Sequence, residues 1–280
     1  MRRSSQEGHP AWMWALGALC ASACATTASS TPRAATGQSP APEGTHLRII
    51  HLIQQRGDLR IDVSAKAGTA RHFVSLHYAD TRTMRLPSGN AQLHIAGHGN
   101  RAVEQVVLWL QEDERHKTRA GSTIVLVRAI DDTNHWLYRQ SVDLQQPARR
   151  DTARLRFFHA FNGVDAVDVC LPGERLTDPG TPLFRKVRYG HFGAGLADAP
   201  AYTELPGDTL VVVQVRVHRD ALCTGRVLGW SDLQLAHGTN HTLLLQHKTT
   251  EGPEADTAQF MYCVDPPARR DRCVAMPLRR

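Results

Sequence analysis

The chain has 280 residues, of which 41% are hydrophobic and 21% are charged, a balance that excludes a largely disordered protein. The formal net charge of +6 at neutral pH is a mild excess for this length. Because no nucleic-acid-binding motif accompanies it, this charge does not predict DNA or RNA as a partner, although it suits anionic partners such as phosphate-bearing glycolipids.

Residues 1–23 are predicted to be a lipoprotein signal peptide. Two early arginines precede the apolar stretch AWMWALGALC, which has the length of a secretory signal and is too short for a membrane span. The stretch ends in Ala21-Ser22-Ala23-Cys24, which resembles the lipobox of bacterial lipoproteins, with alanine where leucine is preferred. This resemblance implies a lipid on Cys24 and, because Ala25 follows, an outer-membrane location. Plain secretion and an uncleaved anchor are the alternatives.

Residues 24–45 are predicted to be a disordered tether. They consist almost wholly of small, polar and proline residues, without the apolar periodicity that could offset the entropy of ordering. As a flexible coil, a segment of this length holds a folded domain about 25 Å from its anchor.

The phrase LRIIHLIQQRGDLRIDV at 47–63 returns as LRFFHAFNGVDAVDV at 155–169. The paired positions are Leu47-Arg48 with Leu155-Arg156, His51 with His159, Ile61-Asp62-Val63 with Val167-Asp168-Val169, LPSGN at 86–90 with LPGDT at 205–209, AGSTIVLV at 120–127 with HGTNHTLLLQ at 237–246, and Val142-Asp143 with Val264-Asp265. Matches in the same order along both halves indicate a tandem duplication of a domain of roughly 105–115 residues. We therefore assign residues 46–147 and 148–268 to two repeats, followed by a basic tail at 269–280.

The pattern within each repeat favours strands. Runs such as TLVVVQVRV at 209–217 are rich in β-branched residues, too short for most helices, and bounded by turn-forming glycine, proline and asparagine. The segment 101–117 has apolar residues at helical spacing, but its counterpart at 226–235 alternates as a strand does, so we predict strands for both. The expected fold is all-β, with two tandem antiparallel β-sandwich domains of immunoglobulin-like type.

The repeated phrase, with LF at 183–184, the LPGD turn and the later GT…TLLL segment, resembles the bacterial surface family called domain of unknown function 4397. The sequence departs from the family pattern in lacking its turn prolines and the aromatic residue of its last motif. The resemblance covers most of residues 46–265. It implies exported β-sandwich proteins, often tandem, with no settled activity.

Four cysteines follow Cys24, all in the second repeat. In an exported protein an even number favours disulfides. We expect Cys170 to pair with Cys223 and Cys263 with Cys273, since the latter two lie close in sequence and could fasten the C-terminal segment to the last strand. A metal site is the alternative, but no Cys-x-x-Cys spacing supports it.

His51 and His159 are the most conspicuous residues that could do chemistry, each with an aspartate nearby (Asp62 and Asp168). We expect each histidine to bond turn carbonyls and hold the following loop. A paired ligand or metal site, or catalysis by His and Asp, is the alternative. No nucleophile at fixed spacing accompanies them, so we predict no catalytic residues, metal or cofactor.

These observations predict an exported, lipid-anchored outer-membrane protein that acts as a non-enzymatic binding or structural module. Its expected partners are the membrane, through the lipid anchor, and an envelope polysaccharide or another surface protein. An envelope-polymer hydrolase and a periplasmic metal or small-molecule carrier are the alternatives. The basic tail either contacts anionic headgroups or is an exposed tail partly tied by the Cys273 bridge.

Overall fold

The protein is described by a computed structural model. It covers residues 44–53, 58–65, 71–87, 89–96, 104–110, 121–128, 136–143, 149–193, 202–248, 257–265 and 273–279. All of these belong to one compact unit that spans 42–280. The expected signal peptide, Cys24 and nearly all of the tether lie outside the described residues.

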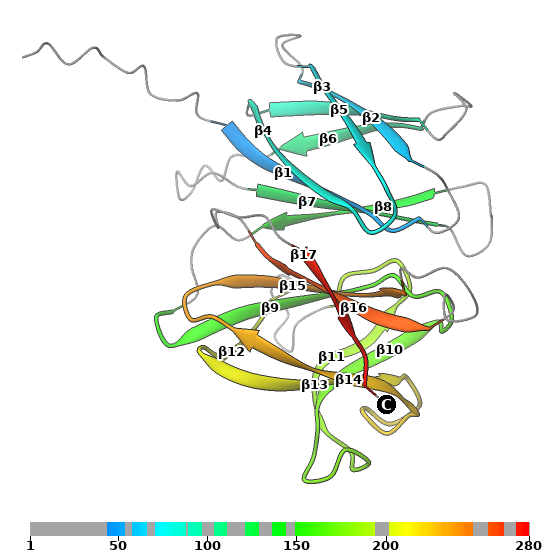
Figure 1. Ribbon diagram of the computed structural model, residues 1–280, viewed down its shortest axis with the longest axis vertical. Helices are drawn as coiled ribbons and strands as arrows, with labels where there is room; N and C mark the ends of the chain where they lie inside the picture. Colours follow the sequence, from blue (N-terminus) through cyan, green and yellow to red (C-terminus); the bar gives the residue numbers. More distant parts are fainter. Residues whose placement is uncertain are drawn as a thin grey trace, which may run out of the picture. The chain divides into compact units, whose positions relative to one another are not determined.

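The described residues of the first half form eight strands. They are β1 (Gly44–His51), β2 (Leu59–Ala65), β3 (Arg71–Leu76), β4 (Thr81–Pro87), β5 (Gly89–Ala96), β6 (Glu104–Leu110), β7 (Gly121–Arg128) and β8 (Trp136–Asp143). They form two sheets with the strand orders β4-β1-β7-β8 and β3-β2-β5-β6 (Figure 1).

The second half repeats this arrangement strand for strand. Its strands are β9 (Thr152–His159), β10 (Ala166–Leu171), β11 (Thr181–Arg188), β12 (Tyr202–Pro206), β13 (Thr209–Val217), β14 (Val227–Leu235), β15 (Asn240–His247), β16 (Ala258–Val264) and β17 (Cys273–Pro277). The sheet orders are β12-β9-β15-β16-β17 and β11-β10-β13-β14, which match those of the first half apart from the added β17. The predicted all-β fold of two tandem sandwiches is confirmed, and 104–110 and 227–235 are strands as expected.

Two features differ from the sequence-based expectation. One pair of strands in each half is parallel, β1 with β7 and β9 with β15. Between the two strands of each pair, the chain crosses to the other sheet of the same half and returns. The segment assigned to a basic tail contains β17, which pairs with β16, and Arg279 then bridges to Trp230 of β14. Arg279 also pairs with Asp232 at 3.0 Å, so this arginine contributes to the edge of the sandwich.

Gly229 permits this close approach of the C-terminal segment. A Cβ at that position would lie 2.7 Å from Cβ of Leu278 and 2.8 Å from the carbonyl oxygen of Arg279. Any larger residue at Gly229 would therefore displace the last residues from β14.

Each half has its own apolar core between its two sheets. In the first half, Leu47 and Ile49 of β1 pack against residues such as Ile61 of β2, and all three are almost fully buried. In the second half, Leu155 and Phe157 of β9 take the corresponding places. Alternating residues of the repeated phrase thus supply the core of each sandwich.

The remaining residues of the same strands form a third apolar cluster, which joins the two halves. It contains Ile50 and Val125 from the first half and Phe158, Leu244 and Met261 from the second. The sheets β4-β1-β7-β8 and β12-β9-β15-β16-β17 therefore face each other (Figure 1), each with both faces covered. This explains why every residue of β15 is buried.

Two arginines of the repeated phrase lie inside this interface and pair across it. Arg48 Nη1 of the first half donates to Asp265 Oδ1 of the second at 2.9 Å. Arg156 Nη2 of the second half lies 2.6 Å from Asp143 Oδ1 of the first. All four side chains are at least 99% buried. The duplication thus supplies each half with one arginine and one aspartate, and each pair crosses to the other half.

The hydrogen bonds around these pairs follow the same duplication. Thr123 donates to Asp143, and its counterpart Thr242 donates to Asp265. Arg156 donates to both threonines, with Nε to Thr242 and Nη2 to Thr123. Each buried carboxylate therefore has a charged donor and a hydroxyl donor, which is what a buried ion needs to offset its loss of hydration.

The arginines also determine the ionisation of this cluster. Arg156 and Arg48 hold the pKa of Asp265 below its usual value of 3.8, against the opposing effect of burial. The carboxylate of Asp265 is therefore charged at neutral pH, and its stabilising contribution is lost only as the pH falls through its lowered folded pKa.

Two tyrosines make a second set of crossed contacts. Tyr78 Oη of the first half donates to the carbonyl of His247 at the end of β15, at 3.1 Å. Tyr189 Oη of the second half donates to the carbonyl of Arg128 at the end of β7, at 2.9 Å. Burial raises the pKa of Tyr189 to about 12, so its hydroxyl keeps its proton at neutral pH.

We expect Asp265→Asn to lower the free energy of unfolding by about 3–5 kcal/mol, because it leaves two buried arginines without full compensation. Urea unfolding of the oxidised protein at neutral pH measures this loss. The matched control is Glu204→Gln, which removes the partly exposed pair Arg154–Glu204 and should cost less than about 1 kcal/mol. Equal losses for the two variants would contradict the role given to the buried pairs.

Candidate functional site

His51 and His159 end the first strand of their halves, and both side chains are fully buried. Nδ1 of His51 accepts a hydrogen bond from the backbone N–H of Ile53 at 3.2 Å. Nδ1 of His159 accepts the equivalent bond from Phe161 at 3.4 Å. Each histidine thus accepts a hydrogen bond from the second residue after its strand; the expected bond to a turn carbonyl is present for His159, as described next, whereas Nε2 of His51 is buried with no hydrogen-bond partner in the described part of the chain.

The second ring nitrogen of His159 fixes its tautomer. Nε2 lies 3.0 Å from the carbonyl oxygen of Val164, and only a protonated Nε2 can donate there. Burial lowers the pKa of both His51 and His159 from 6.5 to about 4. Both rings are therefore neutral at physiological pH, with Nδ1 of His159 free of a proton.

Each histidine is also in edge contact with the tyrosine that crosses the interface. The ring centroids lie 6.4 Å apart for His51 and Tyr78, and 5.9 Å apart for His159 and Tyr189. The histidines therefore connect the loop at the end of each core to the interface between the halves.

We expect the free energy of unfolding to fall as the pH drops from 6.5 towards 4, by on the order of 3 kcal/mol for each buried histidine. The unfolded chain binds a proton near pH 6.5, whereas the folded chain resists it down to about pH 4. His159→Asn should be less stable at pH 7 but lose less than the wild-type protein between pH 7 and 4.5. Urea unfolding at both values measures this.

The control is His237→Asn, whose side chain is 62% exposed and whose loss should change the stability by less than about 1 kcal/mol at either pH. A pH dependence of His159→Asn as steep as that of the wild-type protein would contradict a neutral, buried His159.

Asp168 has a different structural environment from His159. Its neighbours Val167 and Val169 point into the core, so Asp168 lies on the outer face of β10. Its carboxylate accepts the N–H of Lys186 at 2.8 Å and that of Cys223 at 3.1 Å. His218 Nδ1 lies 3.0 Å from the same carboxylate.

The contacts of His159 and Asp168 have no residue in common, so the structure does not bring the two together. The corresponding Asp62 lies on the outer face of β2, and its cross-strand neighbours are Phe73 and His94. The described contacts therefore assemble no His–Asp pair from the repeated phrase in either half.

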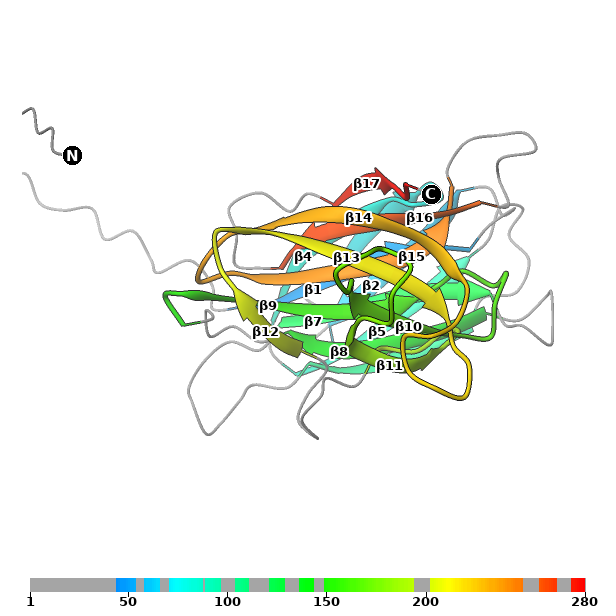
Figure 2. The same ribbon diagram turned by 90° about the horizontal axis from the view of Figure 1, so that it is seen from below.

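The outer sheet of the second half is covered by two segments of the chain, 172–180 and 218–226. Arg216 on β13 donates to the carbonyls of Leu176 at 2.9 Å, Asp178 at 2.8 Å and Gly225 at 3.3 Å. Gln214 also donates to Leu176. Figure 2 looks onto this sheet, with the segments after β10 and β13 in front of it.

Both disulfides are present with the expected pairing. Cys170–Cys223 fastens the covering segment 218–226 to β10, beside Asp168. Cys263–Cys273 joins β16 to β17. The two bridges therefore fasten a covering loop and an added strand of the second half. The first repeat contains no cysteine at all.

Removing the Cys170–Cys223 bridge by replacing both cysteines with alanine should cost about 4 kcal/mol, because it frees the longer loop in the unfolded chain. The same change at Cys263–Cys273 should cost about 3 kcal/mol. The sequence separations are 53 and 10 residues. Urea unfolding under oxidising conditions measures both losses, and a larger loss for the shorter loop would contradict this account.

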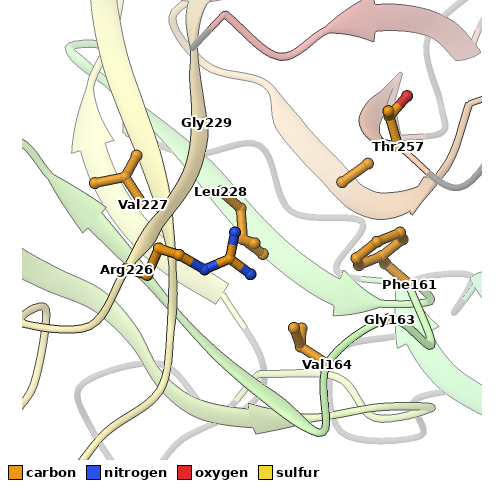
Figure 3. A pocket seen from close by; sticks show the side chains of 9 residues that line it. Phe161, Gly163, Val164, Arg226, Val227, Leu228, Gly229 and Thr257 are labelled. Atoms are coloured by element: carbon orange, nitrogen blue, oxygen red, sulfur yellow. The ribbon is translucent and has the colours of Figure 1, made fainter. Parts of the chain in front are cut away.

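A hollow of about 460 Å³ opens beside the turn that His159 holds. Its apolar wall includes Phe161, Val164 and Leu228, and Arg226 is the charged residue among those that line it. Figure 3 shows the side chain of Arg226 reaching into the hollow between Leu228 and Val164. This arrangement could hold a small group with an apolar part and a negative charge.

Among the described residues, no three His, Cys, Asp or Glu side chains gather where they could hold a metal ion. Nor does any described residue belong to a helix long and apolar enough to cross a bilayer.

Sequence reasoning missed the arginines and tyrosines of the interface. The signal that could have found the arginines is their recurrence, as Arg48 and Arg156, inside otherwise apolar strands. A charged residue at the same place in two buried phrases needs a buried partner, and the recurring Asp143 and Asp265 are the matching carboxylates.

No protein-family model matches the chain, and no curated protein matches its sequence. Among solved structures, it is similar to a fimbrial assembly protein from Parabacteroides distasonis, at 8% identity and a TM-score of 0.24. The match covers 83% of this chain and 99% of that one. A likeness this weak carries no conclusion about function. Because no family model matches, the resemblance to domain of unknown function 4397 stays a prediction.

Proposed function

We propose that the protein is an exported, lipid-anchored module of the bacterial cell envelope that binds or organises other envelope components without catalysing a reaction. The proposal includes the anchor at Cys24, an outer-membrane location, and membership of the surface family that the repeated phrase resembles.

The use of the buried polar groups is the observation that supports this function best. Arg48, Arg156 and their aspartates join the two halves. His159 holds a turn, and Asp168 holds the backbone of two loops. Groups that an enzyme would need for acid–base chemistry are thus engaged in maintaining a fixed scaffold, as a binding or structural module requires.

The disulfides support an extracytoplasmic location, because such bonds form and persist in oxidising compartments. The positive start, the short apolar stretch and the small residues before Cys24 support export and lipidation. A tether of small and polar residues after Cys24 would let the folded part reach partners away from the membrane.

Replacing Cys24 with alanine in the full chain should abolish incorporation of a labelled fatty acid, and a high-salt wash should then release the protein from the membrane fraction. At low salt the unlipidated variant should still sediment with isolated cell envelopes, because binding belongs to the folded part. Continued lipid labelling of Cys24→Ala would overturn the anchor, and a failure of the unlipidated variant to sediment with envelopes at low salt would overturn the binding function.

A further inference from the structure

Strand β11 is an edge strand of the outer sheet of the second half, and it carries a β-bulge. Its register shifts between Val167 and Val169 of β10, so that two residues of β11, Arg185 and Lys186, stand opposite the single residue Asp168. The equivalent strands of the first half, β2 and β3, pair without such a shift. The bulge therefore distinguishes the second repeat from the first.

The bulge turns two adjacent cations away from the core. Phe184 and Val187 are both core residues, whereas regular alternation would leave only one outward-facing residue between them. Here Arg185 and Lys186 both lie between them, and Arg188 follows as the next outward-facing residue. All three cations are exposed, so β11 presents three positive charges within four residues.

Asp168 holds the backbone of this bulge. The φ angle of Lys186 is +43°, in the left-handed region that residues other than glycine rarely adopt. The N–H of Lys186 donates to the buried carboxylate of Asp168 at 2.8 Å, and His218 and Cys223 contact the same carboxylate. Strained backbone that its surroundings fix in this way concentrates at functional sites.

The three cations of β11 carry the positive excess of this face. Within the part of the chain that the structure describes, no ion pair or hydrogen bond involves their side chains. On the two covering segments, exposed acids stand beside exposed arginines, Glu174 beside Arg175 and Asp220 beside Arg219. A bulge with one charge is enough to keep an edge strand from pairing with another molecule, so a cluster of three points to an anionic partner.

An exposed aliphatic side chain lies on the same face. The carbonyl of Leu176, in the covering segment 172–180, accepts hydrogen bonds from Gln214 and Arg216 of β13 (Figure 2). Arg216 is opposite Asp168, so only β10 separates this contact from the bulge. The side chain of Leu176 is 41% exposed. The face therefore combines cations with an apolar group.

This combination suits the surface of an anionic lipid bilayer. A guanidinium can donate two parallel hydrogen bonds to one phosphate, and an ammonium group adds a further positive charge. An exposed aliphatic residue adds apolar contact at the level of the headgroups. The proposed anchor favours the same partner, because the tether at 24–45 keeps the folded part about 25 Å from the bilayer and raises its effective concentration there.

We propose that the outer sheet of the second half docks onto the phosphate headgroups of a lipid bilayer through Arg185, Lys186 and Arg188. Docking by this face directs the first half away from the membrane, towards other envelope components (Figure 1). This inference rests on the proposed function and names one partner of the folded part.

The test measures vesicle binding by the oxidised mature chain, residues 24–280, with Cys24→Ala so that no lipid contributes. Vesicles of one part phosphatidylglycerol to three parts phosphatidylcholine should bind it at about 50 mM salt and release it at about 500 mM, because salt screens exposed charges. Phosphatidylcholine vesicles should bind far less. Replacing Arg185, Lys186 and Arg188 with glutamine should lower the affinity for the anionic vesicles on the order of a hundredfold, or roughly fivefold for each charge.

The matched control replaces three exposed arginines of other elements, Arg82, Arg85 and Arg150, with glutamine. It lowers the net charge equally, but its affinity should fall less than about threefold, because charges remote from the membrane are screened. Circular dichroism and thermal unfolding check that both variants fold, as expected for exposed positions. Equal losses in the two variants, or no binding to the anionic vesicles, would overturn the docking face.

A soluble acidic polysaccharide is the rival partner, with polygalacturonate as its probe. Binding of polygalacturonate that depends on the cations of β11, without binding to the vesicles, would overturn the assignment to lipid. Leu176→Ser should weaken vesicle binding severalfold, because it removes the apolar contact. An unchanged affinity of this variant for the vesicles would contradict insertion of Leu176 among the headgroups.

Envelope sedimentation at low salt separates this inference from the proposed function. If the Cys24→Ala variant sediments with envelopes and the triple change in β11 abolishes this, both stand. If sedimentation survives the triple change, the docking face is wrong but the binding function remains. If the Cys24→Ala variant does not sediment at all, the binding function itself fails.

Discussion

The structure depends on two buried ion pairs that cross between its halves. Arg48 reaches Asp265 and Arg156 reaches Asp143, so neither half satisfies its own buried charge in the same way without the other. Such pairs contribute less to net stability than their Coulomb energy suggests, because each ion loses its hydration. Their larger effect is on geometry: a shift of one sheet against the other would break both crossed pairs, although Arg156 would keep its 3.5 Å contact with Asp265 inside the second half. The pairs therefore select one alignment of the two inner sheets, and the crossed hydrogen bonds of Tyr78 and Tyr189 reinforce it.

This constraint explains why the chain contains the repeated phrase. Side chains on one face of the first strand of each half, such as Leu47 and Leu155, fill the core of each sandwich. The arginines that follow them point to the opposite face, which is the interface. The same surface of each half thus meets its counterpart, the self-complementary pattern of a two-fold interface. The outer sheets have diverged. In the second half two loops, one of them held by a disulfide, bury Asp168, whereas the corresponding Asp62 of the first half is only partly buried.

Much of the fold could be predicted from the sequence because it depends on local patterns. β-Branched runs between turn residues indicated the strands, and matches in the same order indicated two equivalent sandwiches. The partner of Arg48 could not be predicted from local patterns, because the sheet that covers this arginine comes from the other half of the chain; only the recurrence of the arginine in both phrases pointed to its burial. Strand β17 was missed because its five residues are too few to give a strand pattern by themselves. They form a strand by pairing with β16.

The central claim is that the crossed pairs and the apolar cluster around them make the two halves one cooperative unit. Scanning calorimetry of the oxidised full chain tests this directly. The account predicts a single unfolding transition whose calorimetric and van't Hoff enthalpies agree. Two separate transitions, or a calorimetric enthalpy well above the van't Hoff value, would contradict it.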